Sequence, residues 1–380
     1  MQQRKPITPE MIEANKGIFD EHFDPDFAID LVEHLMQHID RLYFRSEFIG
    51  FDPPPERNDP ERPLIFCSNH SGMAFPWDAI VFVSMLALRN GYDFKKSVRA
   101  LTAPMLSMST LMNPFLVENF WKRGGGVDAS FLNFSTMMQY QESNLLVFPE
   151  GVPGIGKGFN KRYQLQRFAT SFVRHAIKYR TDLIPYSTVN GEFINPLNVK
   201  SDFVNMLSQK VGIPFIPVGL MTLFVPLQPW LFYFGFPCKL TFVMGKRIKP
   251  YEMIDKPYEE ITDDEFQEIA DRIKEQMQTE LNEAVKKYGK QPYRFRELFK
   301  LWRKNLRDLP YFMPLLWPSL FAEFDRLARK GRVQPLKINL YKGLKAHLKN
   351  PITFAFYIPL LGWIPILIRG YRERKQLSRK

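Results

Sequence analysis

One histidine in this chain stands where a general base would be placed. The run LIFCSNHSGMAFPWD (Leu64–Asp78) begins as an apolar stretch, which predicts a buried strand, and reaches Asn69 and His70 at its end. A seven-residue loop containing glycine and proline follows, and Asp78 then opens an apolar helical run. An imidazole can remove a proton from a hydroxyl group, and a nearby carboxylate can hold that imidazole in the right tautomer. The spacing therefore predicts His70 as a base and Asp78 as its orienting partner.

A second polar group follows another apolar run. In LLVFPEG (Leu145–Gly151) the predicted strand is followed directly by Glu150 and Gly151. Positive side chains are concentrated just beyond it, at Lys157, Lys161, Arg162 and Arg167. The stretch from Gly151 to Lys157 fits the start of a phosphate-binding P-loop, but the next position must be Ser or Thr to hold magnesium and is Gly158. A nucleotide-hydrolysing loop is therefore disfavoured, whereas the basic residues are candidates for binding a phosphate group.

Each of these groups also has an ordinary structural interpretation. His70 can be a loop histidine, Asp78 can be the N-cap of a helix, and the basic residues can begin a solvated helix. Ser71, beside His70, would be the nucleophile of a hydrolase, but no serine in the chain stands in a G-x-S-x-G elbow. No metal site is expected, because HLMQH (residues 34–38) lacks the glutamate of the H-E-x-x-H motif and a third ligand.

The elements that must position these residues alternate between strand and helix. Apolar periodicity predicts helices within residues 9–50 and at 78–90, 161–179 and 261–290, and strands at 64–68, 145–149, 183–189, 214–219 and 239–244. The helix at 261–290 has a capping box, Thr262 with Glu265, and a stop at Gly289. The alternation predicts an α/β fold, a mixed sheet flanked by helices, over about residues 60–250.

Positive charge is concentrated at the C-terminal end. The chain of 380 residues has a net charge of +12, and residues 291–380 hold 20 Lys/Arg against 5 Asp/Glu, a net of +15. The first 290 residues hold 32 against 35, a net of −3. The basic region is interleaved with two apolar runs, residues 309–321 and 352–368, and not with polar or stacking platforms. An anionic membrane surface, and not nucleic acid, is therefore the predicted partner.

The second apolar run is marginal for crossing a bilayer. Its 17 residues would extend about 25 Å as a helix, and Pro359, Gly362 and Pro365 interrupt it. Basic residues flank it on both sides, whereas a span normally carries a one-sided bias. These features favour a segment that lies in one leaflet. The alternative is a core helix that never meets lipid.

Cysteine content and the first residues suggest where the protein is found. Cys67 and Cys238 are too few for a disulfide framework, and Cys67 lies in a predicted core strand, so a reduced compartment is expected. The beginning, MQQRKPITPEM, lacks the apolar core of a signal peptide. We expect a peripheral or monotopic protein on the cytoplasmic face of a membrane. The expected segments are a helical N-terminal part with a proline-rich connector (1–58), an α/β domain (59–255), an amphipathic helix (256–290) and a membrane-associating region (291–380).

The Asn-His…Asp and Phe-Pro-Glu-Gly groups, in this order, resemble the glycerolipid acyltransferase family, which includes glycerol-3-phosphate and 1-acylglycerol-3-phosphate acyltransferases. The resemblance covers about residues 60–250 and is strongest to a bacterial branch. That branch has an Asn-His-Ser-Gly segment, a Gly-Gly-Val segment and a long block after Phe-Pro-Glu-Gly, which correspond here to Asn69–Gly72, Gly125–Val127 and Phe148–Phe168.

The resemblance implies that His70 is the base, that Asp78 orients it, and that Glu150 and Gly151 form part of the acceptor site. The family has four residues between the histidine and the aspartate, and this chain has seven. Further residues implied to bind substrate are Asn69, Arg123 and the basic residues Lys157, Lys161, Arg162 and Arg167.

The predicted activity is O-acyl transfer to a lysophospholipid or related glycerolipid. His70 would deprotonate the acceptor hydroxyl, which would attack the thioester of acyl-CoA or acyl-carrier protein as co-substrate, with no metal and no other cofactor. Backbone N–H groups of the glycine loops would stabilise the oxyanion. The alternatives are a non-catalytic membrane-binding protein of the same fold, which the intact His70 and Glu150 argue against, and a lipid hydrolase, which lacks a nucleophile elbow.

Overall fold

The computed structural model describes residues 7–72, 75–201, 203, 206, 218–219, 223–331 and 339–372. Within these residues a seven-stranded sheet has the order β1-β9-β6-β2-β5-β3-β4, and β7 and β8 form a separate pair. The strands are β1 Glu47–Ile49, β2 Ile65–Ser68, β3 Val98–Thr102, β4 Val127–Asp128, β5 Asn144–Val147, β6 Leu183–Val189, β7 Asn198–Val199, β8 Val218–Gly219 and β9 Thr241–Met244. Neighbouring strands are parallel except where β9 runs antiparallel to β6, so the sheet is mixed, as expected.

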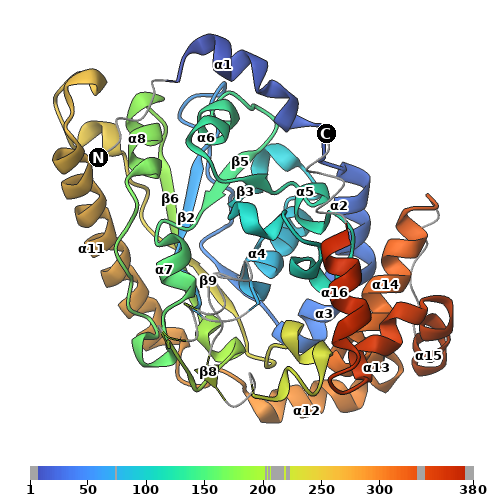
Figure 1. Cartoon of the computed structure of the whole chain (residues 1–380). Coiled ribbons are helices and arrows are strands. Elements are labelled where there is room, and N and C mark those ends of the chain that lie inside the picture. Colours follow the sequence, from blue (N-terminus) through green and yellow to red (C-terminus); the bar gives the residue numbers. More distant parts are fainter. Residues whose placement is uncertain are drawn as a thin grey trace.

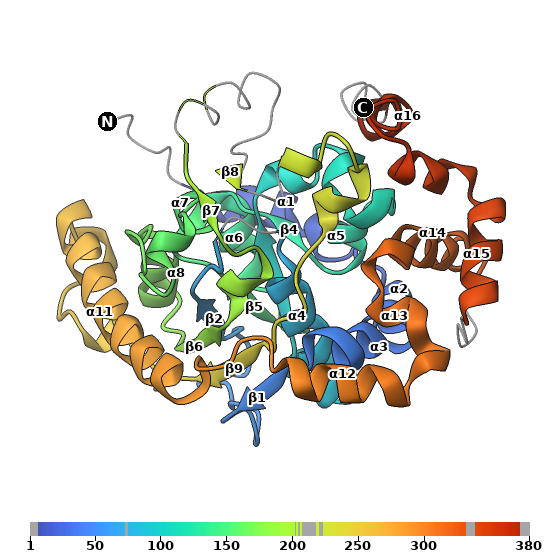
Figure 2. The same ribbon diagram turned by 90° about the horizontal axis from the view of Figure 1, so that it is seen from below.

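Helices cover both faces of this sheet (Figures 1 and 2). They are α1 Pro9–Ala14, α2 Pro25–Leu31, α3 Gln37–Ile39, α4 Trp77–Arg89, α5 Phe120–Arg123, α6 Phe131–Met137, α7 Gly151–Ile155, α8 Ser171–Lys178, α11 Asp263–Tyr288, α12 Phe295–Lys304, α13 Leu309–Phe312, α14 Trp317–Ala328, α15 Leu340–Lys349 and α16 Trp363–Arg372. One hydrophobic core lies between the sheet and α6, α8 and α11. The other lies between the sheet and α4, together with the N-terminal and C-terminal helices.

Successive side chains of the central strands point to opposite faces of the sheet, and both faces are buried. This explains why these strands are apolar runs in the sequence. In β2, Phe66 contributes to the core beside α4, whereas Ile65 and Cys67 contribute to the core beside α11. The neighbouring strands repeat this pattern, because Phe66 pairs with Leu146 of β5 and Ile184 of β6. A parallel strand that is buried on both faces needs apolar residues at every position.

Most of the predicted elements are confirmed. The strands expected at 64–68, 145–149, 183–189 and 239–244 correspond to β2, β5, β6 and β9, and the helices expected at 78–90 and 261–290 correspond to α4 and α11. The capping box of Thr262 and Glu265 is formed, and Gly289 is the C-cap. The strand expected at 214–219 falls partly on β8, and its other residues lie outside the described part of the chain.

Two of the predicted helices are wrong in part. The helix expected at 161–179 begins only at Ser171, because backbone N–H groups before it donate to side chains elsewhere in the fold. Leu165 donates to Gln278, and Gln166 donates to Glu150. The helical region expected through residue 50 ends at Phe44, and residues 47–49 instead form the edge strand β1. The prediction also missed strands β3 and β4.

The two C-terminal apolar runs have different environments. In the run 309–321, Trp317 is fully buried and packs on Trp77 of α4 and Tyr43, with ring centroids 5.1 and 4.9 Å apart. Most side chains of this run complete the core over α4, and within it the apolar side chains of Met313 and Leu315 are exposed. The run 352–368 instead leaves several apolar side chains exposed. Among the described residues, no helix has both the length and the apolar character needed to cross a bilayer.

The burial of α14 leads to a stability prediction. Trp317→Ala should lower the free energy of unfolding by about 3–5 kcal/mol, because it leaves a large cavity between α14 and α4. Tyr341→Ala, at an exposed position of α15, is the control and should change it by less than about 0.5 kcal/mol. Denaturant titration of the full chain measures both. A change below about 1 kcal/mol for Trp317→Ala would mean that the C-terminal helices are not part of the core.

Candidate active site

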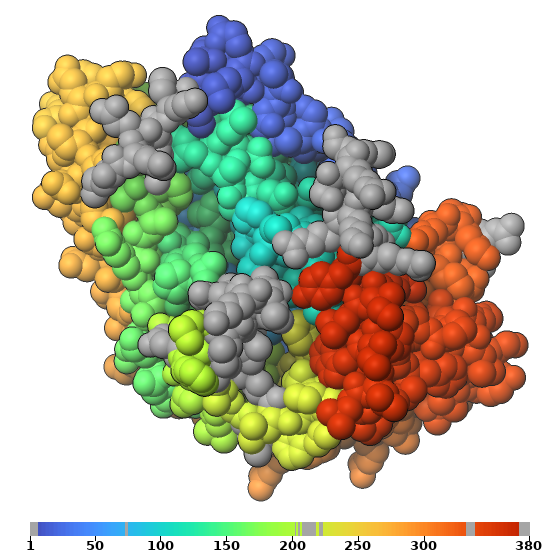
Figure 3. Space-filling model, viewed as in Figure 1, coloured from blue at the N-terminus to red at the C-terminus, as the bar shows by residue number. Residues whose placement is uncertain are grey.

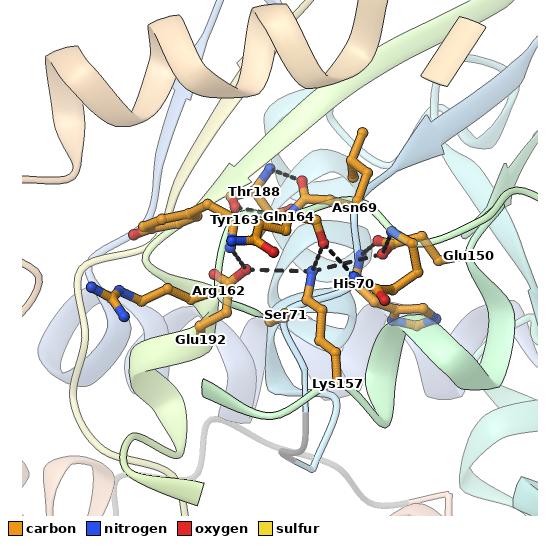
Figure 4. A network of polar contacts seen from close by, with 12 residues as sticks. Asn69, His70, Ser71, Glu150, Lys157, Arg162, Tyr163, Gln164, Thr188 and Glu192 are labelled. Atoms are coloured by element: carbon orange, nitrogen blue, oxygen red, sulfur yellow. Dashed lines mark hydrogen bonds and ion pairs between the residues drawn. The ribbon is translucent and has the colours of Figure 1, made fainter. Parts of the chain in front are cut away.

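Polar residues follow three neighbouring parallel strands at the point where each strand ends. Asn69 and His70 follow β2, Glu150 follows β5, and Glu192 follows β6. Because the carboxyl ends of adjacent parallel strands meet at one edge of the sheet, these side chains come together there (Figure 4). This edge is where open α/β sheets commonly bind their ligands.

His70 is held by its backbone and by one aromatic ring. Its backbone N–H donates a hydrogen bond of 2.8 Å to Oε1 of Glu150, and its imidazole stacks on Phe148 with ring centroids 4.3 Å apart. Within the described part of the chain, no hydrogen bond to either ring nitrogen is present. Burial, and then the positive charge of Lys157, lower the pKa of His70 to about 3, so the ring is neutral at pH 7. A neutral ring with an unoccupied nitrogen is able to accept a proton.

Asp78 is hydrogen-bonded to a different residue from the one expected. It lies in the first turn of α4, where its carboxylate accepts a hydrogen bond from the Ser71 hydroxyl. No hydrogen bond links Asp78 to His70 among the described residues, and burial raises the pKa of Asp78. Asp78 therefore fixes the loop after β2 through Ser71 and not through the imidazole. The same bond occupies the Ser71 hydroxyl, which would have to donate to His70 in a serine hydrolase.

A buried lysine links the ends of β5 and β6. Nζ of Lys157 lies 3.7 Å from Oε2 of Glu150 and 3.7 Å from Oε1 of Glu192, and it donates to the carbonyl oxygen of Gln164. All three charged side chains are almost fully buried. Figure 4 shows the ammonium group between the two carboxylates. Because Glu150 also accepts the His70 N–H, this cluster fixes the backbone that carries the imidazole.

Glu192 was missed by the sequence analysis. Its Oε1 accepts the N–H of Tyr163, whereas its Oε2 is buried and has no hydrogen-bond partner in the described residues. Burial raises the pKa of Glu192 to about 7. A polar residue directly after a predicted buried strand was the signal that identified His70 and Glu150. The same rule applied to the strand at 183–189 leads first to Asn190, so Glu192 is recognised only from its position beside Lys157.

The basic residues predicted to bind substrate lie in different environments. Lys157 is buried in the cluster described above, whereas Lys161, Arg162 and Arg167 are exposed. Arg162 packs over the ring of Phe159 and extends away from the buried cluster (Figure 4). Arg167 donates to a glutamine side chain of α11. These cations therefore do not form a single phosphate cradle around Lys157.

Arg123 and Asn69 have structural contacts. The Arg123 guanidinium lies over the ring of Phe27 and pairs with Asp24 at 3.1 Å and Asp325 at 3.6 Å, so it joins the N-terminal and C-terminal helices. Asn69 is buried and bridges β2 to β6, because its side-chain amide both donates to and accepts from the backbone of Thr188. The structure thus brings Asn69, His70, Glu150 and Lys157 together but does not place Arg123 with them.

Glycines allow the chain to pass close to His70. Gly151 has a φ of +57°, a conformation that favours glycine, and it opens α7 directly after Glu150. A Cβ atom at Gly154 would lie 2.4 Å from Cβ of Glu150 and 3.1 Å from Cβ of His70. The backbone conformation of Gly151 leads the chain into α7, which passes close to Cβ of His70.

His70 and Phe148 are among the residues that line an apolar cavity of about 670 Å³. Its walls come from α4, the residues after β3, α7, the segment 231–234 and α16, and nearly all the side chains facing it are apolar. This volume is in the range of ligand pockets, roughly 300–1,000 Å³. The cavity has room for a long apolar group whose polar end would lie beside the imidazole. No set of three or more His, Cys, Asp or Glu side chains in the described residues is placed to hold a metal ion.

Comparison with known proteins gives distant relatives only. No protein-family model matches the chain. An uncharacterized protein of Mycobacterium leprae is 28% identical over 227 residues, which cover 58% of each chain, so the match spans less than two thirds of that relative. An uncharacterized protein of Mycobacterium tuberculosis is 26% identical over 263 residues, 66% of this chain and 69% of the relative.

One solved structure is also similar. It is the 1-acyl-sn-glycerophosphate acyltransferase PlsC from Thermotoga maritima, which is 12% identical with a TM-score of 0.35, over 65% of this chain and 79% of that chain.

The buried lysine leads to a second stability prediction. Lys157→Met should lower the free energy of unfolding by about 3–5 kcal/mol, because it leaves Glu150 and Glu192 buried without a counter-charge. Lys161→Met, at an exposed position nearby, is the matched control and should have an effect within about 0.5 kcal/mol. Adding Glu192→Gln to Lys157→Met should recover part of the loss. Equal stability of the two lysine variants in denaturant titration would contradict the proposed importance of the cluster.

The raised pKa of Glu192 leads to a pH-dependent prediction. Between pH 4.5 and about 7 the folded state keeps a proton that the unfolded state releases, so this contribution to stability is present below pH 4.5 and is lost as the pH rises through 7. Glu192→Gln removes this titration. Wild type loses this contribution as the pH rises and the variant does not. The free energy of unfolding of the variant minus that of wild type should therefore be about 1–3 kcal/mol larger at pH 8 than at pH 5.

Unfolding free energies of both proteins at the two pH values test this prediction. Glu268→Gln, at an exposed position of α11, is the control. If Glu192→Gln shows the same pH dependence as wild type, Glu192 does not titrate in this range.

Proposed function

We propose that this protein is an O-acyltransferase that moves a fatty acyl group from acyl-CoA or acyl-carrier protein to a hydroxyl of a lysophospholipid or related glycerolipid. The observation that carries the proposal is the position of His70, a neutral imidazole in the wall of a cavity lined by apolar side chains. The cavity offers the environment that a long acyl chain requires, and its lining includes a group able to accept a proton.

The proposed reaction needs only one proton acceptor. His70 takes the proton of the acceptor hydroxyl as its oxygen attacks the thioester carbonyl carbon. The tetrahedral intermediate collapses, the C–S bond breaks, and the leaving thiolate takes the proton back from the imidazolium. Positioned proton transfer of this kind contributes about 10²–10⁴-fold in rate. No metal and no cofactor other than the thioester co-substrate are required.

The other site residues are proposed to position the base and the acceptor. Glu150 holds the backbone of His70 and also accepts the N–H of Gln166, while Lys157 neutralises its charge. We therefore assign Glu150 and Lys157 a positioning role. Among the cations after Glu150, the exposed Lys161 and Arg162 are the ones that an acceptor phosphate could reach from solvent.

A serine hydrolase is the less favoured alternative. In such an enzyme the serine hydroxyl donates to the imidazole, but Ser71 donates to Asp78. A lipid-binding protein without catalysis would use the same cavity, and only an activity measurement separates it from the transferase.

The test is transfer of a labelled acyl group by the purified full chain. Acyl-CoA and acyl-carrier protein are each offered with a panel of lysolipid acceptors, and products are resolved by mass. His70→Ala should reduce transfer at least about a hundredfold, because it removes the proton acceptor. His22→Ala, at an exposed histidine in the N-terminal segment, should keep wild-type activity.

Thermal unfolding of both histidine variants is the control for folding. A folded His70→Ala protein with near-normal turnover would exclude His70 as the base. Absence of transfer with every donor and acceptor would favour the non-catalytic alternative.

A further inference from the structure

An exposed apolar surface lies next to the cavity. We define the rim surface as the exposed apolar side chains of residues 223–227 and 358–368, which are Leu223, Phe224, Leu227, Ile358, Leu360, Leu361, Ile364, Leu367 and Ile368. Leu361 is 67% exposed, Ile364 56% and Ile368 60%. Single exposed apolar residues are ordinary on protein surfaces, but a contiguous group of this size usually marks a contact with a partner or a membrane.

Hydrogen bonds join the two segments of the rim surface, although they are far apart in the sequence. The backbone N–H of Leu360 donates to the carbonyl oxygen of Pro226 at 3.2 Å, and the Trp363 indole N–H donates to that of Val225 at 3.1 Å. Figure 3 shows α16 in red beside the yellow segment on one face of the molecule. The two segments therefore form one continuous surface.

The helix α16 also forms part of the cavity. Trp363 and Leu367 line the cavity that contains His70, and Val225 of the other segment does so as well. Leu361, Ile364 and Ile368 do not line it and are exposed to solvent. The rim surface and the cavity thus share a wall, and Leu367, which lines the cavity, is itself exposed at the rim.

Charge indicates which kind of partner fits the rim surface. Arg369 is exposed at the C-terminal end of α16, and residues 369–380 include six Lys/Arg and one Glu. An apolar helix face followed by cations is the pattern of segments that lie in the interface of an anionic bilayer. A second copy of the chain would bring two strongly basic regions together, which repulsion disfavours.

We infer that the rim surface docks on an anionic phospholipid bilayer, with Leu361, Ile364 and Ile368 inserted among the lipids. In this orientation the cavity at His70 opens toward the bilayer, so an apolar chain can enter it without crossing water. The docking rests on the rim surface and its charge. Only the identity of the chain that enters the cavity rests on the proposed acyl transfer.

Vesicle binding tests the inference with point variants of the full chain, since deletion of residues 291–380 would remove the buried Trp317. Wild type should sediment with vesicles of phosphatidylcholine and phosphatidylglycerol, and bind vesicles of phosphatidylcholine alone more weakly. Raised salt should weaken the binding without abolishing it, because screening acts on charge and not on apolar insertion. The double variant Ile364→Ser/Ile368→Ser should bind at least about tenfold more weakly.

The control is the double variant Phe299→Ser/Leu306→Ser. These residues are 58% and 62% exposed, close to the values for the pair on α16, and Phe299 lies in α12, away from α16 in Figure 2. The control should bind vesicles like wild type, and circular dichroism should show both double variants folded. Equal binding by the α16 variant and wild type, or no binding of wild type to anionic vesicles, would overturn the inference. So would a dimer in solution that the α16 variant loses, since that would mean that a second copy covers the rim surface.

A second measurement separates docking from catalysis. Binding is measured without donor, so it does not depend on turnover. If transfer occurs, the α16 variant should keep wild-type rates with a water-soluble short-chain acceptor and lose at least about tenfold with an acceptor presented in vesicles. An equal loss with both acceptors would contradict a role for docking in substrate access. Binding as expected without any transfer would support the docking and reject the proposed function.

Discussion

The site depends on one buried ion cluster. Lys157 has been removed from water together with Glu150 and Glu192, and each of these charges is tolerated in the interior only because the others are present. The cluster joins the ends of β5 and β6, and through the hydrogen bond from His70 to Glu150 it also holds the end of β2. The position of the imidazole therefore follows from an electrostatic constraint on three strands, together with its stacking on Phe148.

The C-terminal helices support this arrangement from the face of the sheet that α4 covers. Trp317 of α14 packs on Trp77 at the start of α4, the helix that carries Asp78. Farther along the chain, α16 supplies part of the cavity wall that ends at His70. Residues 291–380, expected from their charge to be a separate membrane-associating region, thus contribute to the core, to the cavity and to the exposed rim surface.

Local patterns predicted the parts of this fold that local forces determine. Unbroken apolar runs identified β2, β5 and β6, and the capping box identified the start of α11. Patterns failed where long-range contacts decide. Residues 161–170 have helix-like composition, but N–H groups among them donate to distant side chains. Within the loop after β2, the spacing of His70 and Asp78 did not reveal that Ser71 donates to the carboxylate expected to orient His70.

The same distinction applies to the site and to the C-terminal runs. His70 and Glu150 could be found because each directly follows a recognisable strand, whereas the pairing of Glu192 with Lys157 across the sheet edge is visible only in three dimensions. An apolar run has the same composition whether it packs on protein or on lipid. The sequence therefore could not separate the buried run 309–321 from the exposed residues of 352–368.

The environment of His70 keeps the imidazole neutral. Burial and the charge of Lys157 oppose a positive imidazole, so the ring does not hold a proton at rest. A proton can be accepted only when negative charge develops close to the ring, as it does on the oxygen of a thioester carbonyl under attack. In the proposed reaction the base therefore becomes effective only when donor and acceptor are both in place. In the same proposal, the apolar lining of the cavity would offer few hydrogen bonds to water, which could otherwise compete as the nucleophile.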